Sequence, residues 1–348
     1  MRFGCARTAA FAFLVPLLVT PLASAAEPGE VNVYSYRQPY LINPLLNEFT
    51  DETGIKVNVI YAEKGLIERI QAEGRNSPAD LMLTVDVGNL TQATDAGIAQ
   101  PIQSPALDAA IPPAYRAADG LWIGLTRRAR VVYASKERVK QDTITYEELA
   151  DPKWRGKICI RSGQHVYNVA LIASMIAAHG EAWTETWLKG VRANLARKPA
   201  GDDRLQVKGV YAGECDIAVG NTYYMGVMLQ NDKEPEQKDW ANSVKILFPN
   251  TGDRGTHVNI SGAVMAKYAL HKGNAMKLLE FLASDKGQEM YAEMNNEYPV
   301  KQDVPWSPLV KSWGDFKPDP ISLNEIAGLR KQASELVDKV GFDEGPSS

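Results

Sequence analysis

Apolar and polar positions along the chain alternate between two spacings. Short, mostly apolar runs typical of strands occur at residues 31–35, 55–59 and 79–85. Apolar residues on one helical face follow in segments that begin near Pro44, Leu66 and Asn89, and each segment ends at a glycine. Strand and helix alternating in this way predict a parallel sheet with helices on both faces.

The rest of the chain repeats this pattern. Strands are predicted at residues 130–134, 157–160, 216–220 and 258–264. Helices are predicted at residues 168–179, 182–196, 274–283 and 324–340. No linker rich in Pro, Gly or Ser separates two halves, so we expect several strands to cross between them. This pattern predicts an α/β protein of two hinged lobes, with its ligand in the cleft between them.

The N-terminal segment reads as a secretory signal peptide, residues 1–25. Arg2 and Arg7 precede an apolar stretch at residues 9–19, which is too short to span a bilayer. Ala23-Ser24-Ala25 then offers small residues for cleavage. We therefore expect an exported, unanchored protein of the periplasm.

Composition narrows the classes of function. The 348 residues carry 38 Lys and Arg against 42 Asp and Glu, a net charge of −4, which argues against nucleic-acid binding. No GxSxG, P-loop or GxGxxG motif is present, and no nucleophile–base pair can be named, so we do not expect an enzyme. Cys159 and Cys215, the cysteines beyond the signal peptide, either pair as a disulfide or stay as buried thiols.

Three tyrosines follow predicted strands. Tyr223 and Tyr224 come just after the apolar run 217–219, and Tyr167 comes a few residues after a strand that ends at Ile160. In open α/β sheets, ligands bind beyond the carboxyl ends of the strands, so these phenols are candidates for one site. The alternative is that adjacent tyrosines only pack against the core.

The segment Asn221-Thr222-Tyr223-Tyr224-Met225-Gly226 resembles the paired-tyrosine motif of periplasmic ferric-ion-binding proteins of ABC transporters. Further segments resemble the same family in the same order, including Ser77-Pro78-Ala79-Asp80, Asp151-Pro152-Lys153-Trp154, Arg254-Gly255-Thr256-His257 and Glu297-Tyr298-Pro299-Val300. The resemblance covers nearly all of the chain after the signal peptide. It implies the class II solute-binding fold, with one lobe of residues 26–128 and 257–305 and another of residues 129–256 and 306–348.

The resemblance also implies a ligand set. Tyr167, Tyr223 and Tyr224 match iron ligands of the second lobe, and Arg128 matches an arginine beside the metal and its bound anion. Gln38 and Pro39 stand where many members have His and Tyr, and Val85 stands where many have Glu. The chain thus resembles the subgroup that binds iron through three tyrosines and a small anion such as carbonate.

Other groups are expected near that anion. Backbone N–H groups of Ser162 and Gly163, where the loop enters its helix, are expected to help Arg128 hold it, and Gln38 is a further candidate. The alternative is that Tyr36 or Tyr40 supplies a protein ligand from the first lobe.

The chemistry of phenols favours Fe³⁺. Ionising one tyrosine at pH 7 costs about 4 kcal/mol, and ionising three costs roughly 12 kcal/mol, which requires a hard and highly charged cation. The predicted partners are therefore ferric ion and an inner-membrane ABC permease, for a protein that acts as a monomer and does not bind nucleic acid. The rival within the same fold is a carrier of an organic solute such as a polyamine.

Overall fold

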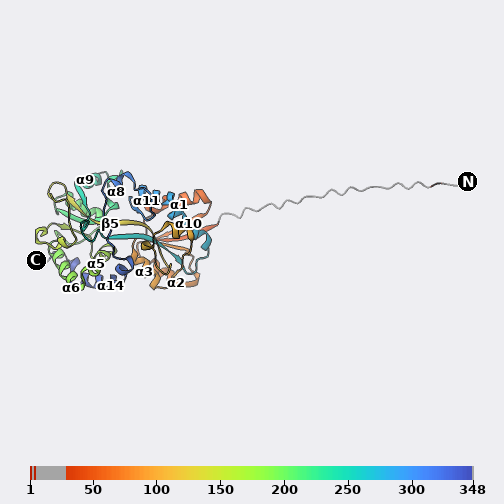
Figure 1. The fold of residues 1–348 in the computed structure, drawn as a ribbon, viewed down its shortest axis with the longest axis horizontal. Coiled ribbons are helices and arrows are strands. Elements are labelled where there is room, and N and C mark those ends of the chain that lie inside the picture. The colour runs from red at the N-terminus through yellow and green to blue at the C-terminus, as the bar shows by residue number, and fades with distance from the viewer. Residues whose placement is uncertain (2–3, 5–28, 347–348) are drawn as a thin grey trace.

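The structure is a computed structural model that describes residues 1, 4 and 29–346. Apart from residues 1 and 4, the predicted signal peptide lies outside the described residues. Two groups of helices lie on either side of the strand β5 (Ile123–Ser135), which runs through the middle of the molecule (Figure 1). No helix in the described part is long and apolar enough to cross a bilayer.

One mixed sheet connects the two halves, and its main path has the strand order β2-β1-β3-β9-β5-β7-β6. The other strands, β4, β8 and β10, pair with β9 or β5. Besides β5, the strands are β1 (Glu30–Ser35), β2 (Lys56–Tyr61), β3 (Leu81–Thr84), β4 (Ala99–Gln100), β6 (Ile158–Cys159), β7 (Ile217–Asn221), β8 (Val244–Leu247), β9 (Val258–Ala266) and β10 (Tyr298–Pro299).

The sheet is more antiparallel than strand–helix alternation predicts. β1 pairs parallel with β2 and β3, and β6 pairs parallel with β7, as expected. The other pairs all involve β5 or β9 and are antiparallel. The reason is that β5 carries the chain into the second half and β9 carries it back, so the two crossing strands run in opposite directions.

Helices pack around this sheet. They are α1 (Pro39–Thr53), α2 (Leu66–Glu73), α3 (Val87–Asp95), α4 (Pro105–Ala110), α5 (Val166–His179), α6 (Glu181–Ala193), α7 (Asp203–Tyr211), α8 (Tyr223–Leu229), α9 (Glu236–Asn242), α10 (Lys272–Ala283), α11 (Asp285–Met294), α12 (Pro308–Lys311), α13 (Leu323–Gly328) and α14 (Arg330–Lys339). The predicted C-terminal helix is thus two helices, which meet at Leu329.

The first helix begins earlier than the sequence pattern predicts. Pro39 is its first residue, and Pro44 lies inside it. Pro44 removes only the hydrogen bond that its N–H would donate to the carbonyl of Tyr40, close to the N-terminal end, so the helix continues through it. This earlier start places Tyr40 in the first helical turn.

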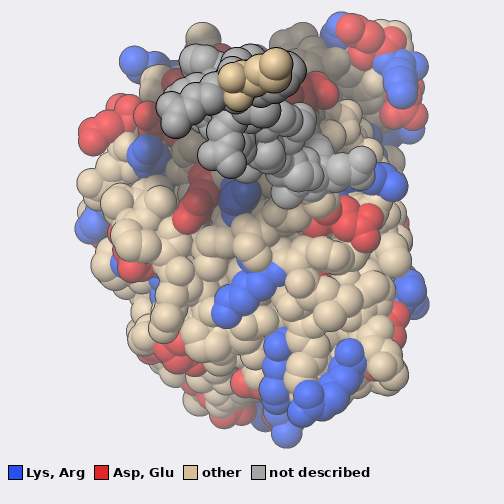
Figure 2. Space-filling view, turned by 90° about the vertical axis from the view of Figure 1, so that its right-hand side faces the viewer, with Lys and Arg blue, Asp and Glu red and all other residues tan. Residues whose placement is uncertain are grey.

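Separate apolar cores support the two halves. Leu125 of β5 and Ala263 of β9 belong to the core under α1 and α10. Val132, farther along β5, belongs to the core under α5 and α6. The disulfide between Cys159 and Cys215 confirms the pairing alternative and ties two segments of the second half together. On the end of the molecule that carries α1, α2 and α10, acidic and basic side chains are interspersed (Figure 2).

Candidate functional site

The structure brings the three predicted tyrosines together. Tyr167 lies in the first turn of α5, and Tyr223 and Tyr224 are the first two residues of α8. The hydroxyl oxygens of Tyr167 and Tyr223 are 3.1 Å apart, and the rings of Tyr223 and Tyr224 have centroids 4.4 Å apart. They meet because β6 and β7 are parallel neighbours, so the segments that follow both strands leave the same edge of the sheet.

Hydrogen bonds to the main chain fix the turn between β7 and α8. Tyr133 donates its hydroxyl to the carbonyl of Asn221 at 2.5 Å, and the N–H of Ala129 donates to the Thr222 hydroxyl at 3.3 Å. The N–H of Asn221 donates to the carboxylate of Asp203 at 2.8 Å. These contacts hold the turn from two sides, so the tyrosine pair is presented in a defined orientation.

Three guanidinium groups surround the ring of Tyr167. The guanidinium carbons of Arg128, Arg130 and Arg161 lie 5.5, 5.8 and 5.3 Å from its centroid. Asp203 pairs with Arg130 at 2.7 Å and with Arg161 at 3.3 Å. Burial would raise the pKa of this carboxyl, but the two arginines outweigh it and lower the pKa. Of these three arginines, Arg128 is therefore the one that does not pair with Asp203, and its charge is available to bind an anion.

Arg128 has the geometry of an anion-binding group. It is almost fully buried, and its Nη1 donates to the hydroxyl of Ser261 at 3.2 Å. The same hydroxyl accepts from Arg37 at 2.7 Å, and Arg37 forms a buried ion pair with Glu297. The Nε and Nη2 atoms of Arg128 are buried without a protein partner among the described residues. Buried donors of this kind need an acceptor, and a small anion fits that requirement.

The environment keeps the phenols of Tyr223 and Tyr224 neutral when no cation is present. Burial raises the pKa of Tyr223 well above its usual range, and the nearby phenols of Tyr167 and Tyr224 add to that effect. Burial also raises the pKa of Tyr224, again with Tyr167 next in importance. Ionising this cluster thus requires a bound cation of high charge.

Histidine near the cluster has a structural role. His165 is the N-cap of α5, and its Nδ1 accepts the N–H of Tyr167 at 3.3 Å. Its ring lies edge-on to that of Tyr167, with centroids 4.5 Å apart. Burial lowers the pKa of His165 to about 3, and the positive charge of Arg161 acts in the same direction. It is therefore neutral at pH 7 and orients the first turn of α5.

Ser162 and Gly163 both contact the C-terminal segment. The Ser162 hydroxyl and the Gly163 N–H both donate to the carboxylate of Asp343, at 2.5 and 2.6 Å. Gly163 also lies against Phe342 and Val337, where a Cβ would come within 2.8 Å of each side chain. The Gly163 N–H, one of the two donors predicted for the anion, is therefore already bonded to a carboxylate from the C-terminal segment. For Ser162 the hydroxyl takes this carboxylate, and its backbone N–H stays a predicted donor.

The first half presents a sparse set of candidate ligands. Tyr36 is used elsewhere, since its hydroxyl accepts the N–H groups of Leu66 and Ile67 at 2.9 and 3.1 Å at the start of α2. Tyr40 is 61% exposed. Although much of the Tyr40 residue is exposed, desolvation by the surrounding protein raises the pKa of its phenol. The charges of Arg204 and Arg37 act in the opposite direction, and Tyr167 is also among the groups that affect it.

The two positions that depart from the family pattern also lie at helix starts. Gln38 is the N-cap of α1, is half-buried, and makes no capping hydrogen bond with its side chain. Val85 is half-buried and directly precedes Asp86, which is buried and caps α3 by accepting the N–H of Gly88 at 2.7 Å. Tyr40 and Gln38 are thus the groups of the first half that remain as candidates.

Some groups of the site were missed by reasoning on the sequence. Arg130, Arg161 and Asp203 form its buried charged wall, and Arg37 with Glu297 orients Ser261. These residues are far apart in the sequence and have no common spacing, so only the fold brings them together.

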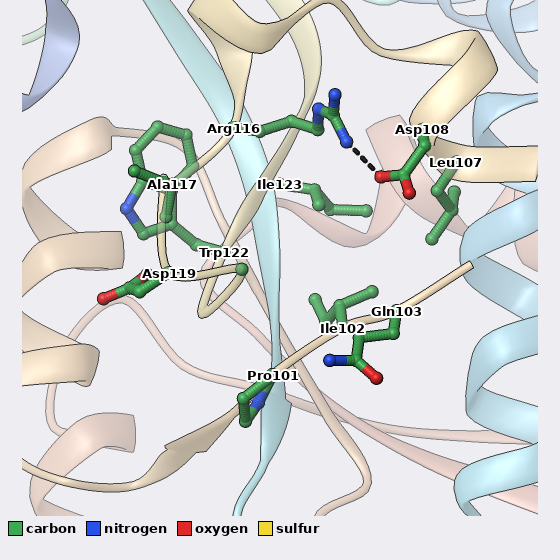
Figure 3. Close-up of a pocket in the computed structure, with 12 residues that line it drawn as sticks. Pro101, Ile102, Gln103, Leu107, Asp108, Arg116, Ala117, Asp119, Trp122 and Ile123 are labelled. Atoms are coloured by element: carbon green, nitrogen blue, oxygen red, sulfur yellow. Dashed lines mark hydrogen bonds and ion pairs between the residues drawn. The ribbon is translucent and has the colours of Figure 1, made fainter. Parts of the chain in front are cut away.

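A separate cavity of about 240 Å³ lies in the first half (Figure 3). Trp122, Ile123 and Ile102 line it, together with an ion pair between Arg116 and Asp108. None of the predicted site residues lines this cavity. It is a different place from the tyrosine cluster.

Within the described residues, no group of three or more His, Cys, Asp and Glu side chains is arranged to hold a metal ion.

The family model described as bacterial extracellular solute-binding protein matches residues 34–289. Iron uptake protein A1 of Synechocystis is 44% identical over 329 residues, which cover 94% of this chain and 90% of that protein.

Two solved structures are similar over 90% of this chain. Apo ferric ion-binding protein A of Pasteurella haemolytica is 50% identical, with a TM-score of 0.86 and 98% of its own chain covered. The Trichodesmium protein IdiA (FutA), solved with iron and citrate, is 45% identical, with a TM-score of 0.85 and all of its chain covered.

Proposed function

The chain belongs to the family of bacterial extracellular solute-binding proteins, and from this premise we propose that it is the Fe³⁺-binding component of an ABC importer. It captures ferric ion between its two halves and delivers it to a membrane permease. The observation that carries this proposal is the 3.1 Å approach of the Tyr167 and Tyr223 hydroxyls. The ring of Tyr224 lies 4.4 Å from that of Tyr223, and three arginines surround the ring of Tyr167.

The charges match a trivalent cation. Three phenolates neutralise Fe³⁺, and oxygen ligands suit a hard ion better than the thiolates that favour copper or zinc. The ion in turn supplies the free energy that ionises phenols whose pKa is raised by burial. Tyr167, Tyr223 and Tyr224 are therefore the proposed ligands.

A small anion completes the proposed coordination. Nε and Nη2 of Arg128 are the donors that would hold carbonate or a comparable oxyanion next to the metal. With Ser162 and Gly163 engaged by Asp343, Arg128 carries this role, and Gln38 at the N-terminus of α1 is the candidate from the facing half.

The division into lobes follows from the same proposal. We place one lobe at residues 26–128 and 257–305 and the other at residues 129–256 and 306–348, so that β5 and β9 act as the hinge. The metal ligands then all belong to the second lobe, and the first lobe closes over them. The chain acts as a monomer in the periplasm after removal of residues 1–25, and it has no catalytic step.

An organic cation such as a polyamine fits this site poorly. Fe³⁺ ionises the three phenols and so acquires three negative charges around it, whereas an ammonium group leaves them neutral. An ammonium group would then face the positive charges of Arg128, Arg130 and Arg161, which lie within 6 Å of the Tyr167 ring, without phenolates to offset them. Two of the relatives described above are named for iron, and the third was solved with iron and citrate.

The test is an absorbance titration of the apoprotein, lacking residues 1–25, with Fe³⁺ supplied as its citrate or nitrilotriacetate complex, in the presence and absence of bicarbonate. Phenolate–iron bonds produce a visible charge-transfer band, so we expect a red colour that saturates at one iron per chain. Spermidine is the comparison ligand, and binding is followed by calorimetry. Absence of the visible band, or tight binding of spermidine in place of iron, would contradict the proposal.

A further inference from the structure

The ligand tyrosines reach the site from two neighbouring strands. Tyr167 follows β6 through a loop, and Tyr223 follows β7 after one intervening residue. The 3.1 Å separation of their hydroxyls therefore depends on how β6 and β7 are placed relative to each other. A shift of either strand moves one ligand away from the other two.

The pairing between these strands is short. Only Ile158 with Ile217 and Cys159 with Ala218 are in register, and β6 lies at the end of the main strand path. On its other side, β6 makes an isolated bridge from Ile158 to Leu195. A ladder of two residue pairs supplies few hydrogen bonds, so the pairing of β6 with β7 alone constrains the Tyr167 segment little.

The disulfide adds a covalent constraint beside this short ladder. Cys159 is the last residue of β6 and Cys215 lies just before β7, with their Cα atoms 5.9 Å apart. Each cysteine precedes its tyrosine, Tyr167 or Tyr223, by eight residues. Both cysteines are buried in the core formed with α7 and α8.

Helix α7 connects the disulfide to the buried charged residues of the site, Arg130, Arg161 and Asp203. Gly209 of α7 lies directly over the disulfide, where a Cβ would be 2.9 Å from the sulfur of Cys159 and 3.2 Å from that of Cys215. Asp203, the first residue of the same helix, bonds both Arg130 and the N–H of Asn221. The disulfide thus sits at the junction of β6, β7 and α7, the elements that carry the ligands and the charges around them.

We infer that Cys159 and Cys215 are positioning residues for iron binding: their disulfide holds Tyr167 against Tyr223 and Tyr224 before the ion arrives. This inference rests on the function proposed above. Without the disulfide, part of the free energy of iron binding must be spent on fixing the placement of β6 relative to β7, so affinity falls. The two sulfurs do not contact the ion in this arrangement; they act through the tyrosines.

The experiment compares the parent protein with two double variants, Cys159→Ala with Cys215→Ala and Cys159→Ser with Cys215→Ser. Iron affinity is measured by competition with a chelator, at a temperature at which circular dichroism shows each protein to be folded. We expect affinity to fall by about tenfold or more, which corresponds to about 1.4 kcal/mol. The charge-transfer band should also shift or weaken per bound iron, because the geometry of the phenolates is relaxed.

Val191→Ala is the matched control. Val191 is buried in the core of the same half, on α6, and is not part of the core that contains the disulfide. This variant should lower the melting temperature while keeping the parental iron affinity and spectrum. If the double variants behave like Val191→Ala, with affinity within twofold of the parent and an unchanged band, the disulfide only stabilises the fold and the inference is wrong.

If neither double variant folds, Gly209→Ala decides the question. Its added Cβ displaces the disulfide of Cys159 and Cys215 without removing it, so iron affinity should fall several-fold with the disulfide still intact by mass spectrometry. Parental affinity in this variant would overturn the inference. A parent protein that does not bind iron would instead refute the proposed function, and the two failures are therefore distinguished.

Discussion

Iron affinity should depend steeply on pH, because the proposed ligands bind only as phenolates. A tyrosine has a pKa near 10, and burial raises the pKa of Tyr223 and Tyr224 further. Without the metal, these phenols are protonated throughout the range from pH 5 to pH 8. Each ligand must then lose one proton when iron binds, so binding is favoured at high pH and opposed as pH falls.

The size of the effect follows from the number of ligands. Three phenols release about three protons per iron, so the logarithm of the affinity should fall by about three for each unit of pH. The line should stay straight between pH 5 and pH 8 for Tyr223 and Tyr224, since the pKa of neither phenol falls inside that window. Loss of carbonate by protonation acts in the same direction at the acidic end.

The assay is competition with a chelator at several pH values, with bicarbonate in excess and with corrections for titration of the chelator and hydrolysis of iron. Tyr224→Phe provides an internal control, because removal of one phenol should reduce the slope from about three protons per iron to about two. A corrected slope below about one proton per iron would refute binding through three phenolates, even if the protein binds iron. An unchanged slope in Tyr224→Phe would remove that residue from the ligand set.

Other predictions test the site residue by residue. Three variants, Tyr167→Phe, Tyr223→Phe and Tyr224→Phe, should each weaken iron binding by at least about a hundredfold, because each leaves one positive charge unbalanced in a buried site. The control is Tyr211→Phe, which should bind iron like the parent, since Tyr211 is half-exposed at the far end of α7. Parental colour and affinity in all three variants would contradict the assignment. Arg128→Ala should weaken iron binding by about ten- to a hundredfold, as loss of hydrogen bonds to a charged group predicts, and should make affinity insensitive to bicarbonate. If affinity in the parent is also insensitive to the removal of bicarbonate and every other small anion, a further protein ligand must complete the coordination.

Much of the architecture follows from local patterns. The parallel strands β1, β2 and β3 and most helices lie where apolar spacing predicts them, because that spacing reports directly which face of an element is buried. The tyrosines were found for a similar reason, since residues just beyond the carboxyl ends of parallel strands lie at one edge of the sheet. The resemblance to a known family then gave these phenols a chemical role.

The antiparallel crossing strands were not predicted in that form. Residues 130–134 read as a short strand, but β5 extends from Ile123 to Ser135 and pairs with four other strands, β7, β8, β9 and β10. Strand direction depends on which distant segment lies alongside, and apolar spacing contains no information about that. Apolar spacing likewise does not show that α13 packs against both α3 and α5, which are distant from it in the sequence.

The hydrogen-bond donors of Ser162 and Gly163 show most clearly what cannot be predicted from the sequence alone. Their place at the start of a helix is visible in the sequence and is typical of anion binding, but Asp343, some 180 residues away, accepts hydrogen bonds from the Gly163 N–H and the Ser162 hydroxyl. Conversely, Asp203 pairs with Arg130 and Arg161, and the Nε and Nη2 donors of Arg128 have no protein partner among the described residues. The sequence sets which groups are able to bind an ion, since ionisation and ligand chemistry belong to the side chain itself. Which of these groups remain available is decided only by the tertiary structure, because a buried charge is satisfied by whichever partner the fold brings within hydrogen-bonding distance.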